Sequence, residues 1–409
     1  MDQTLSNQSQ VEQPKERPAK KQVETLPYWL SGGFRPFFFL GALAMAASVL
    51  LWLPVLFGLY EIPTSFAPRD WHVHTMLFGA IPAIIAGFAL TAVSNWTGRP
   101  HVAGSELLML VVLWLGGRVA VSTSAIIGAP AAALADLAFF AALVWVFARE
   151  VVSAKNYRNL RVVAVVALLG VANACFHLEA MAFGATDHAL RGGIAVVLML
   201  VMLVGGRIIP AFTRNWLMAR QSPVLPAPFT RFDAAAMIVA GAALLAWSAV
   251  PDRAWTAALL IGAGILHAIR LSRWCGLETR AEPLLSILHL GYATIPLGFV
   301  AVGAAILAPG SIDPASATHV WAVGTFGVMT LAVMTRASRG HSGHKLEAGR
   351  LEIAIFALVL LGALARVAAP YAPDVTERFL EVAALAWALA YLGFAVGYGR
   401  MLLLRPASA

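Results

Sequence analysis

Apolar segments long enough to cross a lipid bilayer dominate this chain. Of its 409 residues, 60% are hydrophobic and 12% are charged, whereas soluble domains average about 25% charged residues. A transmembrane helix needs about 20 mostly apolar residues. Segments of this kind lie at approximately 37–60, 71–93, 105–122, 124–148, 160–183, 190–210, 233–250, 254–272, 285–307, 317–336, 351–369 and 379–404. The sequence therefore predicts an all-α, polytopic transmembrane bundle of about 12 helices.

Polar stretches and turn residues between the apolar segments indicate how the chain is organised. Residues 1–26 are polar and basic without an apolar period, which predicts a disordered tail. They also lack the apolar core and small-residue cleavage site of a secretory signal peptide. A turn at Gly128-Ala129-Pro130 is expected to separate two long apolar segments. Residues 27–409 are predicted to form a single membrane domain.

The distribution of Lys and Arg predicts the orientation of the bundle. With the N-terminus placed inside, twenty-two of the 29 basic residues fall in cytoplasmic tails and loops and four fall outside. Cytoplasmic loops of membrane proteins carry an excess of Lys and Arg. We therefore expect both termini to be cytoplasmic. The same asymmetry accounts for most of the +8 net charge without any nucleic-acid partner.

Seven of the ten histidines lie within or at the ends of the apolar segments. Ionisable groups at membrane depth are costly and usually mark functional sites, and histidine is the commonest transition-metal ligand. The predicted topology sorts these side chains into two layers. The outer layer holds His72, His74, His177, His319, Arg118, Asp136 and Glu179, and the inner layer holds His267, His289, His341, His344, Asn95, Asn215, Arg207 and Arg336.

Each of these positions also has a purely structural interpretation. A single buried histidine is more often a hydrogen-bonded core residue than a ligand. His72 and His74 are two positions apart, about 200° around a helix, so they are not expected to face one metal, and His74 is the deeper of the two. His267 and His289 are expected at matching depth on neighbouring helices. The buried arginines and carboxylates fit either interhelical ion pairs or, for the arginines, contacts to haem propionates.

The cysteine pattern excludes one class of haem protein. Cys175 and Cys275 are the only cysteines, and no CxxCH occurs. Covalent c-type haem attachment is therefore excluded. The predicted topology also places the two thiols near opposite membrane faces, so a disulfide between them is not expected.

Several ordered strings are more specific than these layers. They are Gly33-Phe34-Arg35-Pro36-Phe37-Phe38, Trp71-His72-Val73-His74-Thr75-Met76-Leu77-Phe78-Gly79, Ser94-Asn95-Trp96-Thr97-Gly98-Arg99-Pro100, Gly206-Arg207-Ile208-Ile209-Pro210, His289-Leu290-Gly291-Tyr292 and Thr335-Arg336-Ala337-Ser338-Arg339-Gly340-His341-Ser342-Gly343-His344. Together they resemble the NnrS family of bacterial inner-membrane proteins. That family is associated with nitric oxide metabolism, and its members are described as containing haem and copper.

The resemblance implies which residues bind the cofactors. Non-covalent b-type haem is expected at His72, His74, His267, His289, His319, Arg35, Arg99, Arg207 and Arg336, and metal at His74, His267, His289, His319 and His341. Copper is a further expectation. The chain departs from the family at Thr75, where a glutamate is usual, and at His344, where an arginine is usual. The first departure removes a carboxylate that could orient a ligand or carry protons.

The leading hypothesis is a haem-binding protein of the bacterial inner membrane that handles nitric oxide, or a species derived from it, during nitrosative stress and denitrification. Whether it is an enzyme and which electron donor serves it are not written in the sequence. One alternative is a metal-free transporter that uses buried histidines, arginines and carboxylates. Another is a scaffold or assembly factor for a respiratory enzyme.

Overall fold

The fold is an all-helical membrane bundle. The computed structural model describes residues 27–405, and the predicted tail at 1–26 lies outside them. Helices form the regular structure of the described part, which contains no strand. Twelve of its helical spans are long and apolar enough to cross a membrane. The prediction of a multi-pass protein with about 12 transmembrane helices is confirmed.

The spans follow one another with short connections. In chain order they are α2 (Phe34–Leu56), α3–η2–α4 (Pro68–Thr97), α5 (Gly104–Ser122), α7 (Ala129–Ser153), η3–α8 (Tyr157–Phe183), α9 (Asp187–Met218), α10 (Arg231–Ala249), α11 (Ala254–Ser272), α12 (Pro283–Leu307), α13–η5–α14 (Pro314–His341), α15–η6 (Arg350–Tyr371) and η7–α16 (Pro373–Leu403).

Several boundaries differ by a few residues from those predicted, and two of the differences have a clear physical reason. The fourth span begins at Ala129 rather than at 124, because Gly128 has a φ of +89° and interrupts the chain after the short helix α6 (Ser124–Ile127). The expected turn at this glycine is confirmed. The sixth span, α9, continues to Met218, beyond the predicted end at 210. The polar residues Thr213, Arg214 and Asn215 end the continuous apolar run, but the helix continues through them.

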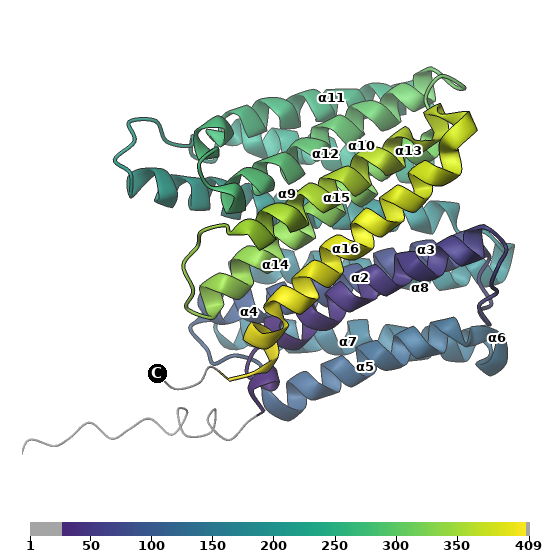
Figure 1. The fold of residues 1–409 in the computed structure, drawn as a ribbon, viewed down its shortest axis with the longest axis horizontal. Helices are drawn as coiled ribbons and strands as arrows, with labels where there is room; N and C mark the ends of the chain where they lie inside the picture. Colours follow the sequence, from purple (N-terminus) through teal and green to yellow (C-terminus); the bar gives the residue numbers. More distant parts are fainter. Residues whose placement is uncertain (1–26, 406–409) are drawn as a thin grey trace, which may run out of the picture.

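Sequential spans are mostly neighbours, and the two ends of the chain close the bundle. The helices α8 to α12 pack in order, and α16 packs against both α15 and α2. Figure 1 shows the start of α2 and the end of α16 at the same side of the bundle. We call this side the terminal end and the opposite side the distal end. The charge pattern predicts that the terminal end faces the cytoplasm.

Two spans run through the interior of the bundle. The most apolar stretch of Pro68–Thr97 is 83% buried and that of Pro314–His341 is 61% buried, against 28–50% for the other ten. Each begins with a proline at the helix start, and each contains a π-helical segment, η2 (Thr75–Ala80) and η5 (Val320–Gly327). Such segments are rare and are frequently found at functional sites. Each follows directly on a histidine, His74 in one span and His319 in the other.

The outer surface of the bundle is apolar, as lipid contact requires. Large side chains such as Trp145, Leu245 and Val396 are 70–82% exposed within their transmembrane helices. In water such exposure would favour aggregation, but hydrocarbon chains solvate these side chains. The polar groups within the spans are instead turned inward, where they form the clusters described next.

Candidate functional site

A cluster of buried polar side chains, the Asp136 cluster, lies near the distal end. It comprises His74, Arg118, Asp136, Asn173 and His177, from four consecutive spans. The Nε2 atoms of His74 and His177 each lie 3.1 Å from Oδ2 of Asp136. Asn173 donates to the same oxygen at 2.7 Å through Nδ2. One carboxylate oxygen therefore faces three nitrogen atoms.

The remaining contacts of this carboxylate come from an arginine. Nη2 of Arg118 contacts Oδ1 of Asp136. This ion pair is the structural interpretation that the sequence left open for Arg118 and Asp136. It leaves Nε and Nη1 of Arg118 buried without a hydrogen-bond partner. Gly79 in η2 makes room for the guanidinium, because a Cβ there would lie 2.4 Å from Nη1.

The three ligand-type residues of this cluster could hold a metal ion. One donor atom from each of His74, Asp136 and His177 lies within 4.8 Å of the other two, and all three residues are buried. His74 is among the residues that the sequence analysis predicts as metal ligands. Asp136 and His177 were placed in the same outer layer but not among the predicted ligands. The sequence feature that could have identified both residues is a pair of ionisable side chains at matching depth on consecutive spans.

His177 also lines a cavity of about 280 Å³. The other lining residues include Ser65 before α3, Pro130 at the start of α7, and Met181 near the end of α8. These positions all belong to the distal end of the bundle. The cavity therefore extends from the distal end of the bundle to a member of the Asp136 cluster.

His72 belongs to a different group, the His72 cluster, formed with Trp52, His319 and Arg366. Its imidazole stacks on the Trp52 indole with ring centroids 4.5 Å apart and an angle of 14°. His72 and Arg366 both lie close enough to His319 for their charges to interact. His72 and His74 therefore take part in separate clusters. The expectation that they do not face one metal agrees with this arrangement.

The hydrogen bonds of the His72 cluster leave ligand-type atoms free. Nδ1 of His319 lies 2.6 Å from the Ala315 carbonyl oxygen. Because a carbonyl only accepts, Nδ1 must carry the proton, and Nε2 of the neutral ring then holds a lone pair. Nδ1 of His72 and Nη1 of Arg366 are buried without a hydrogen-bond partner. The cluster thus offers imidazole nitrogens and a guanidinium donor with no partner in the protein.

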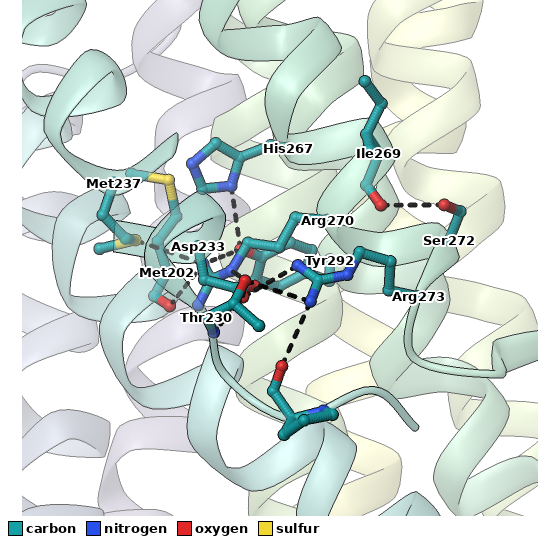
Figure 2. Close-up of polar contacts among 11 residues, drawn as sticks. Met202, Thr230, Asp233, Met237, His267, Ile269, Arg270, Ser272, Arg273 and Tyr292 are labelled. Carbon is teal, nitrogen blue, oxygen red and sulfur yellow. Dashed lines mark hydrogen bonds and ion pairs between the residues drawn. The ribbon is translucent and has the colours of Figure 1, made fainter. Parts of the chain in front are cut away.

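A third group, the Tyr292 cluster, lies toward the terminal end and is drawn in Figure 2. It comprises Asp233, His267, Arg270, Arg273 and Tyr292. The Arg270 guanidinium donates through Nη1 to the Tyr292 hydroxyl at 2.8 Å, and its Nε lies 3.3 Å from Oδ1 of Asp233. The same hydroxyl lies 3.0 Å from Nδ1 of His267. Arg273 donates to Oδ2 of Asp233 at 2.9 Å.

The structure gives His267 and His289 different partners. The spans that carry them, α11 and α12, do pack together as expected. However, His267 contacts Tyr292, whereas Nε2 of His289 lies 2.9 Å from the Thr213 hydroxyl on α9. Each ring keeps one buried nitrogen without a partner, Nε2 in His267 and Nδ1 in His289. Their role as cofactor ligands stays a prediction.

The four arginines that the family resemblance singled out all make contacts toward the terminal end. Nη1 of Arg35 donates to the Met401 carbonyl at 2.9 Å, and Nε of Arg99 donates to Glu150 at 2.7 Å. Arg207 donates to Asn159 at 3.3 Å, and the Arg336 guanidinium lies 4.4 Å from the centre of the Phe212 ring. The arginines beside the distal histidines are Arg118 and Arg366 instead.

The predicted metal ligands therefore do not form one site. His74 and His319 lie in the two distal clusters, whereas His341 ends α14 at the terminal end with its ring 5.6 Å from that of Phe34. His101, in the loop before α5, bonds through Nδ1 to the Ser94 hydroxyl at 2.8 Å. Partial burial lowers the pKa of His101, and the positive charge of Arg35 lowers it further. His344 is exposed beyond the helix end.

A comparison with protein families assigns the chain as a whole. The family model described as NnrS protein matches residues 28–406. The chain belongs to the NnrS family. A search of curated proteins finds no match to it. Membership in the NnrS family suggests a role in the response to nitric oxide, and the buried histidine–aspartate–histidine group of this NnrS protein is compatible with a metal or haem cofactor.

Proposed function

We propose that this membrane protein binds non-covalent b-type haem at the His72 cluster and handles nitric oxide, or a species derived from it, during nitrosative stress and denitrification. The observation that supports the proposal is that His72 and His319, from the two innermost spans, lie within electrostatic range of each other and of Arg366. The bacterial inner membrane is the proposed location. The bilayer, nitric oxide and an electron donor are the proposed partners, and copper is a further proposed metal.

The residues of the His72 cluster fit the demands of haem. Histidine ligates haem iron through an imidazole nitrogen, and the Ala315 carbonyl orients His319 so that Nε2 holds its lone pair. Stacking on Trp52 fixes the plane of the His72 ring. The unpartnered Nη1 of Arg366 suits a propionate carboxylate, because a guanidinium binds carboxylates with charge-assisted hydrogen bonds.

The position of the cluster suits a gas. When bound, haem supplies an iron atom that can coordinate nitric oxide. His319 lies five residues inside the span that begins at Pro314, about 8 Å along the helix axis. Nitric oxide is apolar enough to concentrate in lipid, so the apolar surroundings of the two imidazoles favour its capture over that of ions. The Arg366 guanidinium lies at the distal border of this region, in the last turn of α15.

Optical spectroscopy of the purified full chain tests the proposal. After haem-replete expression we expect a Soret band and a reduced-minus-oxidised b-type spectrum that nitric oxide shifts. His72→Ala and His319→Ala should each lower the haem-to-protein ratio at least tenfold, and Arg366→Gln should lower haem retention less. His188→Ala is the matched control, because this exposed imidazole pairs with Glu179 at the same end of the bundle.

Two results would contradict the proposal. A protein that carries no haem after such expression would overturn the cofactor. Full haem retention in both His72→Ala and His319→Ala would place the haem elsewhere, and the histidines of the terminal end would then be the next variants.

A further inference from the structure

We propose that His74, Asp136 and His177 bind one divalent first-row transition-metal ion, and that Arg118 is the internal cation that occupies the carboxylate when the ion is absent. This site is separate from the proposed haem, because His74 and His72 belong to different clusters. The inference does not depend on haem or on nitric oxide. It assigns a second inorganic site to the interior of the bundle.

The spacing of the donor atoms suits a metal. A transition ion bound about 2.1 Å from each ligand holds neighbouring ligand atoms roughly 3.0–3.5 Å apart. Both imidazole nitrogens lie 3.1 Å from the same Asp136 oxygen. The Asn173 amide oxygen lies 2.9 Å from Nε2 of His74, so a fourth donor atom is adjacent. Two imidazoles and a carboxylate are a common donor set for non-haem iron and zinc.

The hydrogen-bonded arrangement of the same residues is poorly satisfied. Nε2 of His74 hydrogen-bonds to the Asn173 amide oxygen and also lies 3.1 Å from Oδ2 of Asp136, while Nδ1 of the same ring is buried without a partner. Arg118 uses Nη2 on the other carboxylate oxygen while Nε and Nη1 remain buried without partners. Most buried donors in native proteins are paired. A guanidinium held by one of its three nitrogens is therefore suited to displacement.

Electrostatics makes Arg118 and a metal ion mutually exclusive. A divalent cation on Asp136 would repel the guanidinium that contacts the same carboxylate, with little solvent between them to screen the charges. Metal binding must therefore move Arg118 away from Asp136. The arginine lies near the distal end of α5, one turn before Ser122, so its long side chain can swing toward the distal surface.

The cavity at the distal end supplies a route for the ion. It has a volume of about 280 Å³ and is lined by His177, the only residue of the proposed ligand set that borders it. An ion entering from the distal surface would meet His177 first and then Asp136 and His74. His177 is therefore both a ligand and the point of entry.

Zinc binding to the detergent-purified, metal-stripped full chain tests the inference. Equilibrium dialysis with Zn²⁺, read out by elemental analysis, should give one ion per chain. Asp136→Asn and His177→Ala should each weaken binding by more than about a hundredfold, because loss of an outer partner alone costs 10–100-fold. Arg118→Leu should tighten binding at least tenfold, which a structural ion pair would not do. His188→Ala is the control and should leave zinc binding unchanged.

A second variant keeps the test decisive if Arg118→Leu does not fold. His177→Cys retains Arg118 and replaces one nitrogen ligand by sulfur. X-ray absorption of its zinc complex should then show a Zn–S distance of about 2.3 Å. Absence of that distance overturns the inference, as does zinc binding that is unchanged by Asp136→Asn.

Discussion

Asp233→Asn is expected to destabilise the bundle strongly, because it leaves the Arg270 charge without its carboxylate. Asp233 and Arg270 have side chains only 4% and 2% exposed, with Nε of Arg270 3.3 Å from the carboxylate. Removing one partner of a buried ion pair typically costs about 3–5 kcal/mol. The lower figure is roughly a 150-fold change in the unfolding equilibrium constant. The Tyr292 hydroxyl still accepts from Arg270, so the lower figure is the better expectation.

Arg273→Gln provides the matched control on the same carboxylate. The Arg273 side chain is 24% exposed and lies 2.9 Å from Asp233, a shorter distance than that to Arg270. Partly solvated ion pairs contribute only about 0–1 kcal/mol. The exposure of the arginine, rather than its distance from Asp233, should therefore decide which variant loses more folding stability. Asp233→Asn also weakens the hydrogen bond from the Thr230 backbone N–H, which adds up to about 1 kcal/mol to its cost.

The assay is reversible unfolding of the purified protein from detergent into SDS, followed by circular dichroism and by tryptophan fluorescence. Trp274 is a local reporter, because its ring centre lies 4.6 Å from that of Tyr292. The double variant Asp233→Asn with Arg270→Met should recover part of the lost stability, since no unpaired charge stays buried. Equal destabilisation by Asp233→Asn and Arg273→Gln would refute the reasoning.

Two further predictions concern packing and pH. Gly298→Ala should lower the folding stability by about 1–3 kcal/mol, because its Cβ would lie 2.2 Å from Nε1 of the fully buried Trp321. Gly262→Ala is the control: its Cβ meets no atom within 4 Å, so the variant should be neutral or stabilising in thermal unfolding. Because the pKa of His101 is lowered by partial burial and by Arg35, the unfolded chain takes up a proton before the folded one. Stability should therefore fall as pH drops below about 6.5, and less so in His101→Gln; a pH profile unchanged by this variant would contradict the assignment.

Sequence patterning was sufficient for the architecture. Apolar segments of bilayer length can satisfy their backbone polar groups in lipid only as helices, which is why composition alone predicts the twelve spans. Gly128 could be recognised as a break because its position between two apolar runs requires a turn. The helix ends were less predictable, since α9 continues to Met218 through residues that hydropathy treats as loop.

The ligand candidates were only partly predictable. Depth along a helix follows from residue number, so His74, Asp136 and His177 could be placed in one layer. Which members of a layer meet depends on the rotation of each helix and on its neighbours. The π-helical segments η2 and η5 change that rotation directly after His74 and His319, and nothing in the local sequence signals them.

The sequence by itself determined the helical class, the number of spans, the layers of ionisable residues and the family, because each follows from composition or from the order of residues along the chain. Tertiary structure alone decided the partners. It set His72 and Arg366 within electrostatic range of His319, His74 beside Asp136 and His177, and two arginines on one buried aspartate. The physical reason is that hydropathy specifies how deep a side chain lies, whereas packing between helices specifies which way it points.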